Sequence, residues 1–185
     1  MAPSTETLRP FHRGAYHIGT DRMGASLSLD ALTPDEAAEL GKSFAAMDPW
    51  LSYGLSAAAL GAFFSRVEPD VVRYAIRRGG VLAGVVIVRT VWLHGPYLWF
   101  VGLLDAHQSC GTGANILAWL EGEARTAGAR NLWLCVSEIN TRARAVYEHK
   151  GFRLVGDLDG LTADHMTELL MRKRLLPVAS PNPPA

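Results

Sequence analysis

Apolar residues recur along this chain with two different periods, which predict strands and helices in turn. Residues 25–32, ASLSLDAL, alternate with the two-residue period of a half-buried strand. The apolar residues of the next stretch recur at helical spacing, at Ala37, Leu40, Phe44 and Met47. Thr33 can cap such a helix, Pro34 suits its first position and Glu36 completes a capping box. We therefore expect a helix that begins at residue 34 and ends at Asp48-Pro49.

A second helix and a hairpin are predicted next. Residues 56–66, SAAALGAFFSR, have the composition and spacing of a shorter helix. Residues 71–78 and 81–93 are rich in β-branched side chains and are joined by Gly79-Gly80, a pair typical of a tight hairpin. The first half of the chain is therefore predicted to contain a strand, two helices and two paired strands.

The second half alternates strands with helices. The predicted elements are a strand over 97–105, a helix from 112 to about 127, a strand over 131–136, a helix over 140–151, and strands over 152–158 and 164–175. Asn140 is placed to cap the second of these helices, and Gly151 to end it. The order β-α-α-β-β-β-α-β-α-β-β predicts the α/β class, with a mixed, mostly antiparallel central sheet and helices on both faces.

The two ends of the chain lack these patterns. We expect residues 1–23 to form a flexible N-terminal extension, and residues 177–185, PVASPNPPA, to form a disordered proline-rich tail. Residues 24–176 contain no linker, repeat or shift in composition, so they are predicted to form a single domain. With 49% apolar residues, the 185-residue chain can build one sizeable core.

Composition and charge argue against several classes of function. The formal net charge is zero, so nothing in the charge balance points to nucleic acid or to a membrane surface as a partner. The longest apolar run, VLAGVVIV, is too short to cross a bilayer, and the N-terminus lacks the apolar core of a signal peptide. Cys110 and Cys135 make neither a disulfide framework nor a metal site, so we expect no bound metal and a cytoplasmic location.

The segment QSCGTGAN, residues 108–115, joins a predicted strand to a predicted helix. The first turn of a helix presents unpaired backbone N–H groups and a partial positive charge, and glycine lets a ligand approach them closely. This junction is therefore suited to bind phosphate. It lacks the Gly-Lys-Ser/Thr ending of a P-loop and the third glycine of a dinucleotide-binding fingerprint. The glycine pair alone also leaves open a plain turn.

A second segment, NTRARAVYEHKGF over residues 140–152, changes this balance. Asn140, Ala143 and Tyr147 lie three and four residues apart and therefore share one face of the predicted helix. Tyr147 should project from the side on which the helix begins. The alternative for Tyr147 is an ordinary packed tyrosine whose hydroxyl is satisfied within the fold.

Together the two segments resemble those of the GNAT superfamily of N-acetyltransferases, whose members use acetyl-CoA. The family pattern Q/R-x-x-G-x-G/A matches Gln108-Ser109-Cys110-Gly111-Thr112-Gly113. The pattern N-x-x-A-x-x-x-Y, followed by Gly-Phe, matches Asn140, Ala143, Tyr147, Gly151 and Phe152. The spacing of the two segments and the order of elements also agree, so the resemblance covers roughly residues 25–174.

The resemblance implies where acetyl-CoA would bind. In this family the diphosphate lies on backbone amides of the glycine-rich loop and its helix. The pantetheine arm lies between the fourth and fifth strands, here 97–105 and 131–136, with Gly102 suited to a β-bulge. The cofactor-binding residues so implied are Leu103, Leu104, Gln108, Ser109, Cys110, Gly111, Thr112, Gly113, Ala114, Asn140, Ala143 and Arg144.

Two features of the loop depart from the family. Ser109 and Cys110 occupy positions where the family usually has glycine and basic residues. The positive charge for the 3′-phosphate would then come from Arg142, Arg144 or Lys150, for which an exposed helix face is the alternative explanation. Backbone donors should supply most of the binding in either case.

The resemblance also implies a mechanism with a general acid and a general base. Tyr147 would protonate the departing CoA sulfur, because a phenol is protonated at neutral pH. The backbone N–H groups of Leu103 and Leu104 would hold the pantetheine or the carbonyl oxygen. The fourth predicted strand lacks the glutamate that many family members carry there. Glu168, Glu138 and His165 remain as candidate bases acting through water, and Glu168 is the one we name.

One further departure concerns the acceptor. The run LWLCV over residues 132–136 resembles the LWLEV of ribosomal-protein alanine acetyltransferases, with Cys135 at the place of a catalytic glutamate. This difference counts against the same substrate. Aromatic residues gather where the acceptor usually enters, at Trp50, Tyr53, Trp92, Tyr97 and Trp99. If they line a cleft, the acceptor is amphipathic or aromatic rather than highly charged, although core packing is the alternative for Trp92 and Trp99.

We therefore expect direct transfer of an acetyl group from acetyl-CoA to a primary amine of a small molecule or peptide, in a ternary complex. Two alternatives stay open on the sequence alone. One is a protein N-terminal acetyltransferase, and the other is a non-catalytic module that binds or senses acyl-CoA. A homodimer is compatible with the resemblance.

Overall fold

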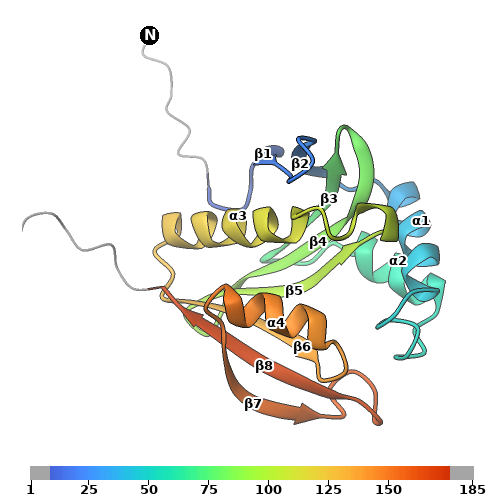
Figure 1. The fold of residues 1–185 in the computed structure, drawn as a ribbon, viewed down its shortest axis with the longest axis vertical. Helices are drawn as coiled ribbons and strands as arrows, with labels where there is room; N and C mark the ends of the chain where they lie inside the picture. The colour runs from blue at the N-terminus through green and yellow to red at the C-terminus, as the bar shows by residue number, and fades with distance from the viewer. Residues whose placement is uncertain (1–8, 176–185) are drawn as a thin grey trace, which may run out of the picture.

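A single eight-stranded sheet runs through the protein, as the computed structural model of residues 9–175 shows (Figure 1). The strand order is β1-β2-β3-β4-β5-β6-β8-β7. The strands are β1 (Ala15–Thr20), β2 (Ser26–Ala31), β3 (Val71–Arg78), β4 (Val81–Trp92), β5 (Gly95–Leu103), β6 (Asn131–Ser137), β7 (Arg153–Asp159) and β8 (Thr167–Arg174). All neighbours pair antiparallel except β5 and β6, which are parallel. The predicted mixed, mostly antiparallel α/β architecture is confirmed.

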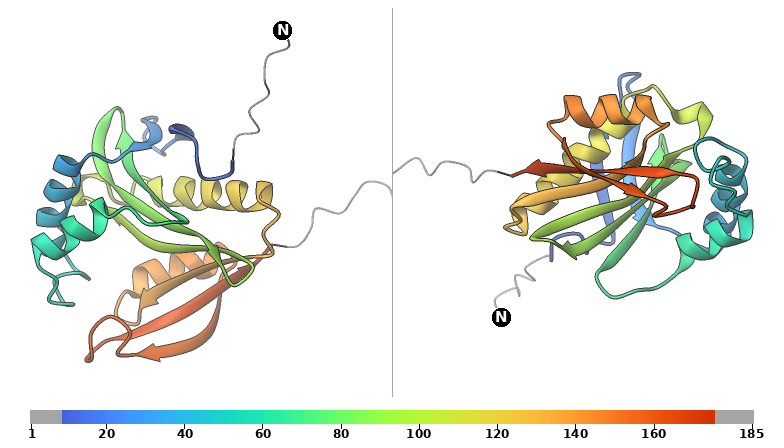
Figure 2. Two further views of the ribbon diagram at one scale, coloured as in Figure 1. Left: turned by 180° about the vertical axis from the view of Figure 1, so that it is seen from behind. Right: turned by 90° about the horizontal axis from the view of Figure 1, so that it is seen from below.

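Helices cover both faces of the sheet (Figure 2). They are α1 (Pro34–Ala45), α2 (Ala57–Ser65), α3 (Thr112–Thr126), α4 (Thr141–His149) and the short 3₁₀ helix η1 (Asp105–His107). The predicted capping box forms, because the Thr33 hydroxyl accepts from the backbone of Glu36 and the Glu36 carboxylate accepts from the backbone of Thr33. One core cluster lies under α3 and a second, containing Phe44 and Phe64, lies under α1 and α2.

The N-terminal segment departs from the prediction. Residues 9–23 were expected to belong to a flexible extension, yet they contain strand β1, which pairs with β2. Phe11 and Tyr16 are buried, and the Phe11 N–H and the Tyr16 hydroxyl both donate to the Glu123 carboxylate on α3, at 2.7 and 3.0 Å. Glu123, more than 100 residues away in the sequence, holds this segment in place. The sequence around residues 9–23 contains no pattern that indicates this contact. Residues 1–8 and the predicted tail 177–185 lie outside the described residues.

The sheet opens between β5 and β6. These strands pair at Tyr97 with Trp133 and at Leu98 with Leu134, near their N-terminal ends, and then diverge in a V (Figure 1). The register of β5 against β4 also shifts here, because Ile87 faces Phe100 whereas Val88 faces Leu98. Trp99 is therefore the extra residue of a β-bulge.

The bulge was expected at Gly102, which instead pairs regularly with Val85. Gly102 serves a packing role. A Cβ atom at this position would lie 2.7 Å from Phe44 Cζ and 2.9 Å from Phe100 Cε1, so a larger residue would collide with the core under α1 and α2.

No helix among the described residues is both long enough and apolar enough to cross a membrane. No three His, Cys, Asp or Glu side chains within residues 9–175 are grouped to hold a metal ion.

Candidate active site

The predicted phosphate-binding loop forms the entry to α3. Ser109 and Gly111 have left-handed backbone conformations, with φ of 64° and 92°, and Gly111 is the N-cap of α3. Ala114 N–H donates to Gly111 O at 3.0 Å, whereas the N–H groups of the first helical residues, Thr112 and Gly113, lie before any intrahelical partner. A Cβ atom built on Gly113 would meet no atom within 4 Å. This helix end is therefore open to a ligand.

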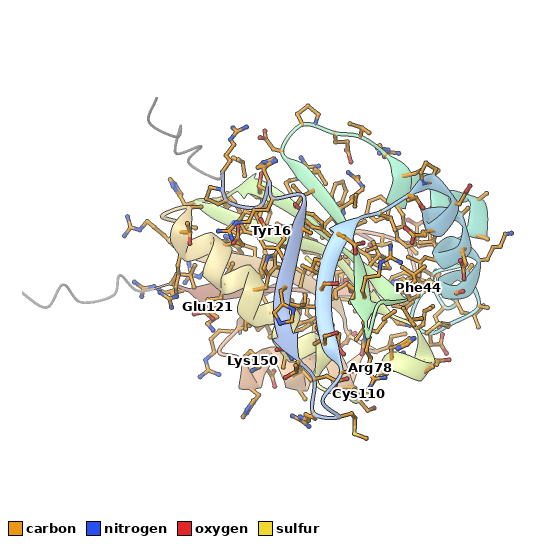
Figure 3. The ribbon with its side chains drawn as sticks, turned by 90° about the horizontal axis from the view of Figure 1, so that it is seen from above. Tyr16, Phe44, Arg78, Cys110, Glu121 and Lys150 are labelled. Atoms are coloured by element: carbon orange, nitrogen blue, oxygen red, sulfur yellow. The ribbon has the colours of Figure 1, made fainter. Side chains whose placement is uncertain are left out.

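Side-chain contacts fix the shape of the loop. Gln108 Nε2 donates to Leu103 O and to Asp105 Oδ1, both at 3.1 Å, which closes the turn between β5 and α3. Arg142 on α4 donates to the Ser109 hydroxyl at 2.6 Å and so ties the two motif segments together. Cys110 of the loop lies near Arg78, the last residue of β3 (Figure 3). The Cys110 carbonyl accepts a hydrogen bond from the N–H of Arg22, in the turn between β1 and β2.

A cleft of about 990 Å³ extends from this loop between α3 and α4. Of the predicted cofactor-binding residues, those that line it are Leu103, Gln108, Ser109, Gly111, Gly113, Ala114, Asn140 and Ala143. Cys110, Thr112, Leu104 and Arg144 are not among its lining residues. The Thr112 side chain points into the core instead, where its hydroxyl is buried without a hydrogen-bond partner.

The cationic residues of this cleft differ in part from the prediction. Arg142 and Lys150 line it, as one of the predicted alternatives required. Arg144 instead forms an exposed ion pair with Glu148, one helical turn along α4, at 2.9 Å. Arg22, from the turn between β1 and β2, joins the lining. No sequence motif pointed to Arg22 as a phosphate-binding residue. It lies in the segment 1–23, which was predicted to be flexible and not to pack against the domain.

The two backbone donors predicted at the end of β5, the N–H groups of Leu103 and Leu104, have different partners in the structure. Leu104 N–H already donates to Ala83 O at 2.9 Å, so it is not free to hold a ligand. Successive N–H groups of a strand point to opposite edges. Leu103 N–H therefore points away from β4, towards the opening between β5 and β6. Of the two predicted backbone donors, Leu103 alone faces the cleft.

Helix α4 brings three of the predicted residues to the opening in the sheet. The Asn140 side chain accepts from Ala143 N–H at 3.1 Å and caps the helix, as predicted. Tyr147 lies two turns into the helix, half-buried, with its ring edge-on to Phe152 at 5.9 Å between centroids. Burial raises the pKa of Tyr147 to about 12. Its phenol is therefore protonated at neutral pH.

A second cleft of about 770 Å³ lies on the α1 and α2 side of the opening. The five aromatic residues predicted for the acceptor side all line it: Trp50, Tyr53, Trp92, Tyr97 and Trp99. The two clefts share Tyr147, Asn140, Ala143, Val101, Pro49 and Trp50. They therefore meet at Tyr147. We call the first the loop cleft and the second the aromatic cleft.

Glu168 lies in the aromatic cleft with 5% of its surface exposed. Tyr53 donates a hydrogen bond to its carboxylate. Burial raises the pKa of Glu168 above its usual value, and the hydrogen bond from Tyr53 offsets part of this rise. Ser137, its cross-strand neighbour on β6, is 3% exposed, lines the same cleft, and has a hydroxyl without a hydrogen-bond partner. Sequence inspection missed Ser137, since an isolated serine carries no pattern.

The other predicted base candidates lie elsewhere. Glu138 and His165 are exposed and are not among the residues that line either cleft, and His165 Nε2 is 3.0 Å from the carbonyl oxygen of Ser52. Cys135 lines the aromatic cleft beside Tyr97. Burial raises the pKa of the Cys135 thiol, so the thiol keeps its proton at neutral pH. Cys135 therefore does not replace the glutamate of the LWLEV pattern as a base. Glu168 is the buried carboxylate that the structure brings to this cleft.

Comparison with known proteins agrees with this geometry. The model of the acetyltransferase (GNAT) family matches residues 34–152. No curated protein matches the chain. A solved nourseothricin acetyltransferase is 28% identical, with a TM-score of 0.52 over 57% of this chain and 66% of that one. The chain thus spans slightly less than two-thirds of that enzyme.

Two further solved structures share the fold at lower identity. The ribosomal-protein-S18-alanine N-acetyltransferase from Escherichia coli is 21% identical, with a TM-score of 0.64 over 86% of this chain and 99% of that one. A GNAT family acetyltransferase from Elizabethkingia anophelis, solved with acetyl-CoA bound, is 13% identical, with a TM-score of 0.52 over 57% of this chain and 77% of that one.

Proposed function

The chain belongs to the acetyltransferase (GNAT) family. We propose that it takes the acetyl group of acetyl-CoA and transfers it directly to a primary amine in a ternary complex, with Tyr147 as general acid and Glu168 as general base. The observation that carries the proposal is the position of Tyr147 at the junction of the loop cleft and the aromatic cleft. A donor in one cleft and an acceptor in the other would both reach its hydroxyl.

The loop cleft fits the phosphates of acetyl-CoA. The open first turn of α3 offers backbone N–H groups, and Gly113 leaves the space that a phosphate needs. Arg22, Arg142 and Lys150 supply positive charge that the loop itself lacks. Leu103 N–H, at the opening of the sheet, would hold the amide groups of the pantetheine arm. When bound, acetyl-CoA supplies the acetyl thioester that an amine attacks.

Tyr147 is suited to the acid role. The C–N bond forms as the C–S bond breaks, and the departing sulfur needs a proton. A phenol with a pKa of about 12 retains its proton at neutral pH and can still give it to a developing thiolate in a site shielded from water. The protein then regains this proton from solvent before the next cycle.

Glu168 is suited to the base role. An amine attacks only in its uncharged form, so the ammonium form of the acceptor must lose a proton. Glu168 is the carboxylate that lines the aromatic cleft, and its raised pKa brings it closer to that of a working base. Tyr53 orients the carboxylate through its hydrogen bond. The proton passes from the amine to Glu168, directly or through one water molecule.

The test begins with acetyl-CoA binding by calorimetry, followed by release of free CoA thiol against a mixed panel of amines and peptides. A ternary-complex mechanism predicts intersecting lines in double-reciprocal plots, in which the initial rate is measured against one substrate at several fixed concentrations of the other. Parallel lines would contradict this mechanism. Tyr147→Phe should lower kcat about 100-fold or more, with little change in acetyl-CoA affinity. Unchanged turnover in this variant would remove Tyr147 from the mechanism.

The same panel separates small amines from protein N-termini. Cys135 stands where the resemblance to the alanine acetyltransferases would require a glutamate, so we expect small amphipathic amines to be better acceptors than peptides with a free N-terminus. The opposite preference would favour the peptide alternative.

A further inference from the structure

The aromatic cleft contains two opposite charges. Among the described residues that line it, Arg89 on β4 and Glu168 on β8 are the ones with a formal charge. Between them the lining is apolar or aromatic and includes Trp99, Tyr97 and Leu134. A ligand that fills the cleft therefore meets a cation on one side, an anion on the other and an apolar surface in between.

The charge of Arg89 is weakly compensated. Its guanidinium lies 4.6 Å from the ring centre of Trp99, and its nearest carboxylate, Glu68, is 4.0 Å away. Glu68 is already held by Arg73 at 2.5 Å, and Arg66 also approaches it at 4.0 Å. One carboxylate thus faces three guanidinium groups, and Arg89 is the one of the three that lines the cleft. Positive charge is left over for a ligand.

The other side of the cleft is built to receive a polar group. The Ser137 hydroxyl is buried next to Glu168 without a hydrogen-bond partner, and a buried polar group without a hydrogen bond is energetically unfavourable. A ligand group that can donate to Glu168 and bond Ser137 would recover this cost. A primary amine has both abilities.

The two charged residues are too far apart for one small ligand group to reach both. Arg89 pairs with Tyr97, and Tyr97 pairs with Trp133. Ser137 lies four residues beyond Trp133 on β6, an offset of roughly 13 Å along the strand, to which the spacing of about 4.8 Å between neighbouring strands adds. Glu168 lies on the next strand again. The Arg89 guanidinium reaches along the cleft to the ring of Trp99 and so covers part of this gap. The amine and the carboxylate of an α-amino acid share one carbon and cannot span the rest, whereas groups on opposite ends of a ring-sized body can.

We infer that the acceptor is an amino carboxylate, whose primary amine lies at Glu168 and Ser137 and whose carboxylate lies at Arg89, separated by an apolar body of about the size of one ring that packs on Trp99 and Tyr97. This inference rests on the proposed function, since it names the substrate class of the same site. Arg89 is then a specificity-determining residue.

The test compares 4-(aminomethyl)phenylacetic acid with its primary amide, which has almost the same shape but no negative charge, since an NH2 group replaces one carboxylate oxygen. Initial rates are followed by release of CoA thiol. We expect kcat/KM for the acid to exceed that for the amide by about tenfold, mainly through KM, as one charge-assisted contact supplies. Arg89→Gln should bring this ratio close to one, and Arg89→Lys should restore part of it. Arg66→Gln, which removes a neighbouring cation outside the cleft, should leave the ratio as in the wild type.

A wild-type ratio of one or below overturns the inference, as does a ratio that survives Arg89→Gln. Acetyl-CoA affinity, measured on the same samples, separates this failure from a wider one. If the wild type binds acetyl-CoA and acetylates other amines but neither of this pair, the inference fails and the proposed function stands. If acetyl-CoA does not bind, the proposed function itself fails.

Discussion

Tyr53, in the loop that follows α1, donates a hydrogen bond to Glu168 on β8, a residue 115 positions later in the chain. A second contact joins the same two regions, since His165 Nε2 lies 3.0 Å from Ser52 O. The loop between α1 and α2 is therefore held against the C-terminal hairpin, beside the aromatic cleft. The carboxylate that we propose as the base is thus positioned by a segment from the other end of the domain.

Replacing Glu168 by Gln should lower kcat about 100-fold or more, because an amide cannot accept the proton of the acceptor ammonium. A base works in its deprotonated form. The wild-type rate should therefore fall as the pH drops through the raised pKa of Glu168, and this acid limb should disappear in the variant. Steady-state rates across the pH range provide the measurement. Glu138→Gln is the control, since Glu138 is exposed and outside the cleft lining.

Removing the Tyr53 hydroxyl should shift the same acid limb in a defined direction. The hydrogen bond from Tyr53 favours the charged carboxylate and lowers the pKa of Glu168, against the larger effect of burial, which raises it. Tyr53→Phe should therefore raise that pKa further and move the acid limb of the kcat profile to higher pH. A limb that stays in place, or that moves to lower pH, would show that Tyr53 does not act on Glu168.

Gly113→Val should weaken acetyl-CoA binding about tenfold or more, because the added side chain occupies the space at the start of α3 that a phosphate needs. The fold should tolerate the change, as a Cβ at Gly113 meets nothing within 4 Å and valine suits a helix better than glycine. Gly122→Val, at an open exposed position of the same helix, is the matched control. Equal affinities for acetyl-CoA in the two variants, measured by calorimetry, would mean that the loop does not hold the phosphates.

Glu123→Ala should destabilise the protein by about 2–4 kcal/mol, because it leaves Phe11 N–H and the Tyr16 hydroxyl buried without an acceptor. Urea denaturation measures the loss, and hydrogen exchange should show β1 opening first. Glu121 lies on the same helix as Glu123 and forms half-exposed ion pairs with Arg125 of α3 and with Lys173 of β8. Glu121→Ala removes these ion pairs and should cost about 1 kcal/mol or less. A similar loss in both variants would contradict the role given to Glu123.

The elements that depend on neighbours in sequence were predicted well. The capping box at Thr33 and Glu36, the Gly79-Gly80 turn with φ of 58° and 81°, and the Asn140 cap all formed where the sequence indicated. Each is an interaction over a few residues, so the sequence contains both partners side by side. The two motif segments were located at the start of α3 and along α4 for the same reason, because each is a pattern of residues close together in the sequence.

Features that depend on a distant partner were missed or misplaced. Strand β1 is ordered by Glu123 of α3 and by pairing with β2, and the bulge at Trp99 exists only relative to β4. Leu104 N–H lost its expected role because Ala83 O binds it. These outcomes follow from long-range pairing, which one-dimensional periodicity does not encode.

The sequence by itself determined the order of the elements from β2 to β8, the family and the residues of the two motifs, because these are set by local spacing and residue type. The tertiary structure alone decided that Arg22 joins the loop cleft, that Ser137 and Tyr53 lie beside Glu168, and that Arg89 and Glu168 line the same aromatic cleft. The physical reason is that the candidate site lies where β5 and β6 diverge, and its lining comes from strands, helices and loops that are far apart in the sequence.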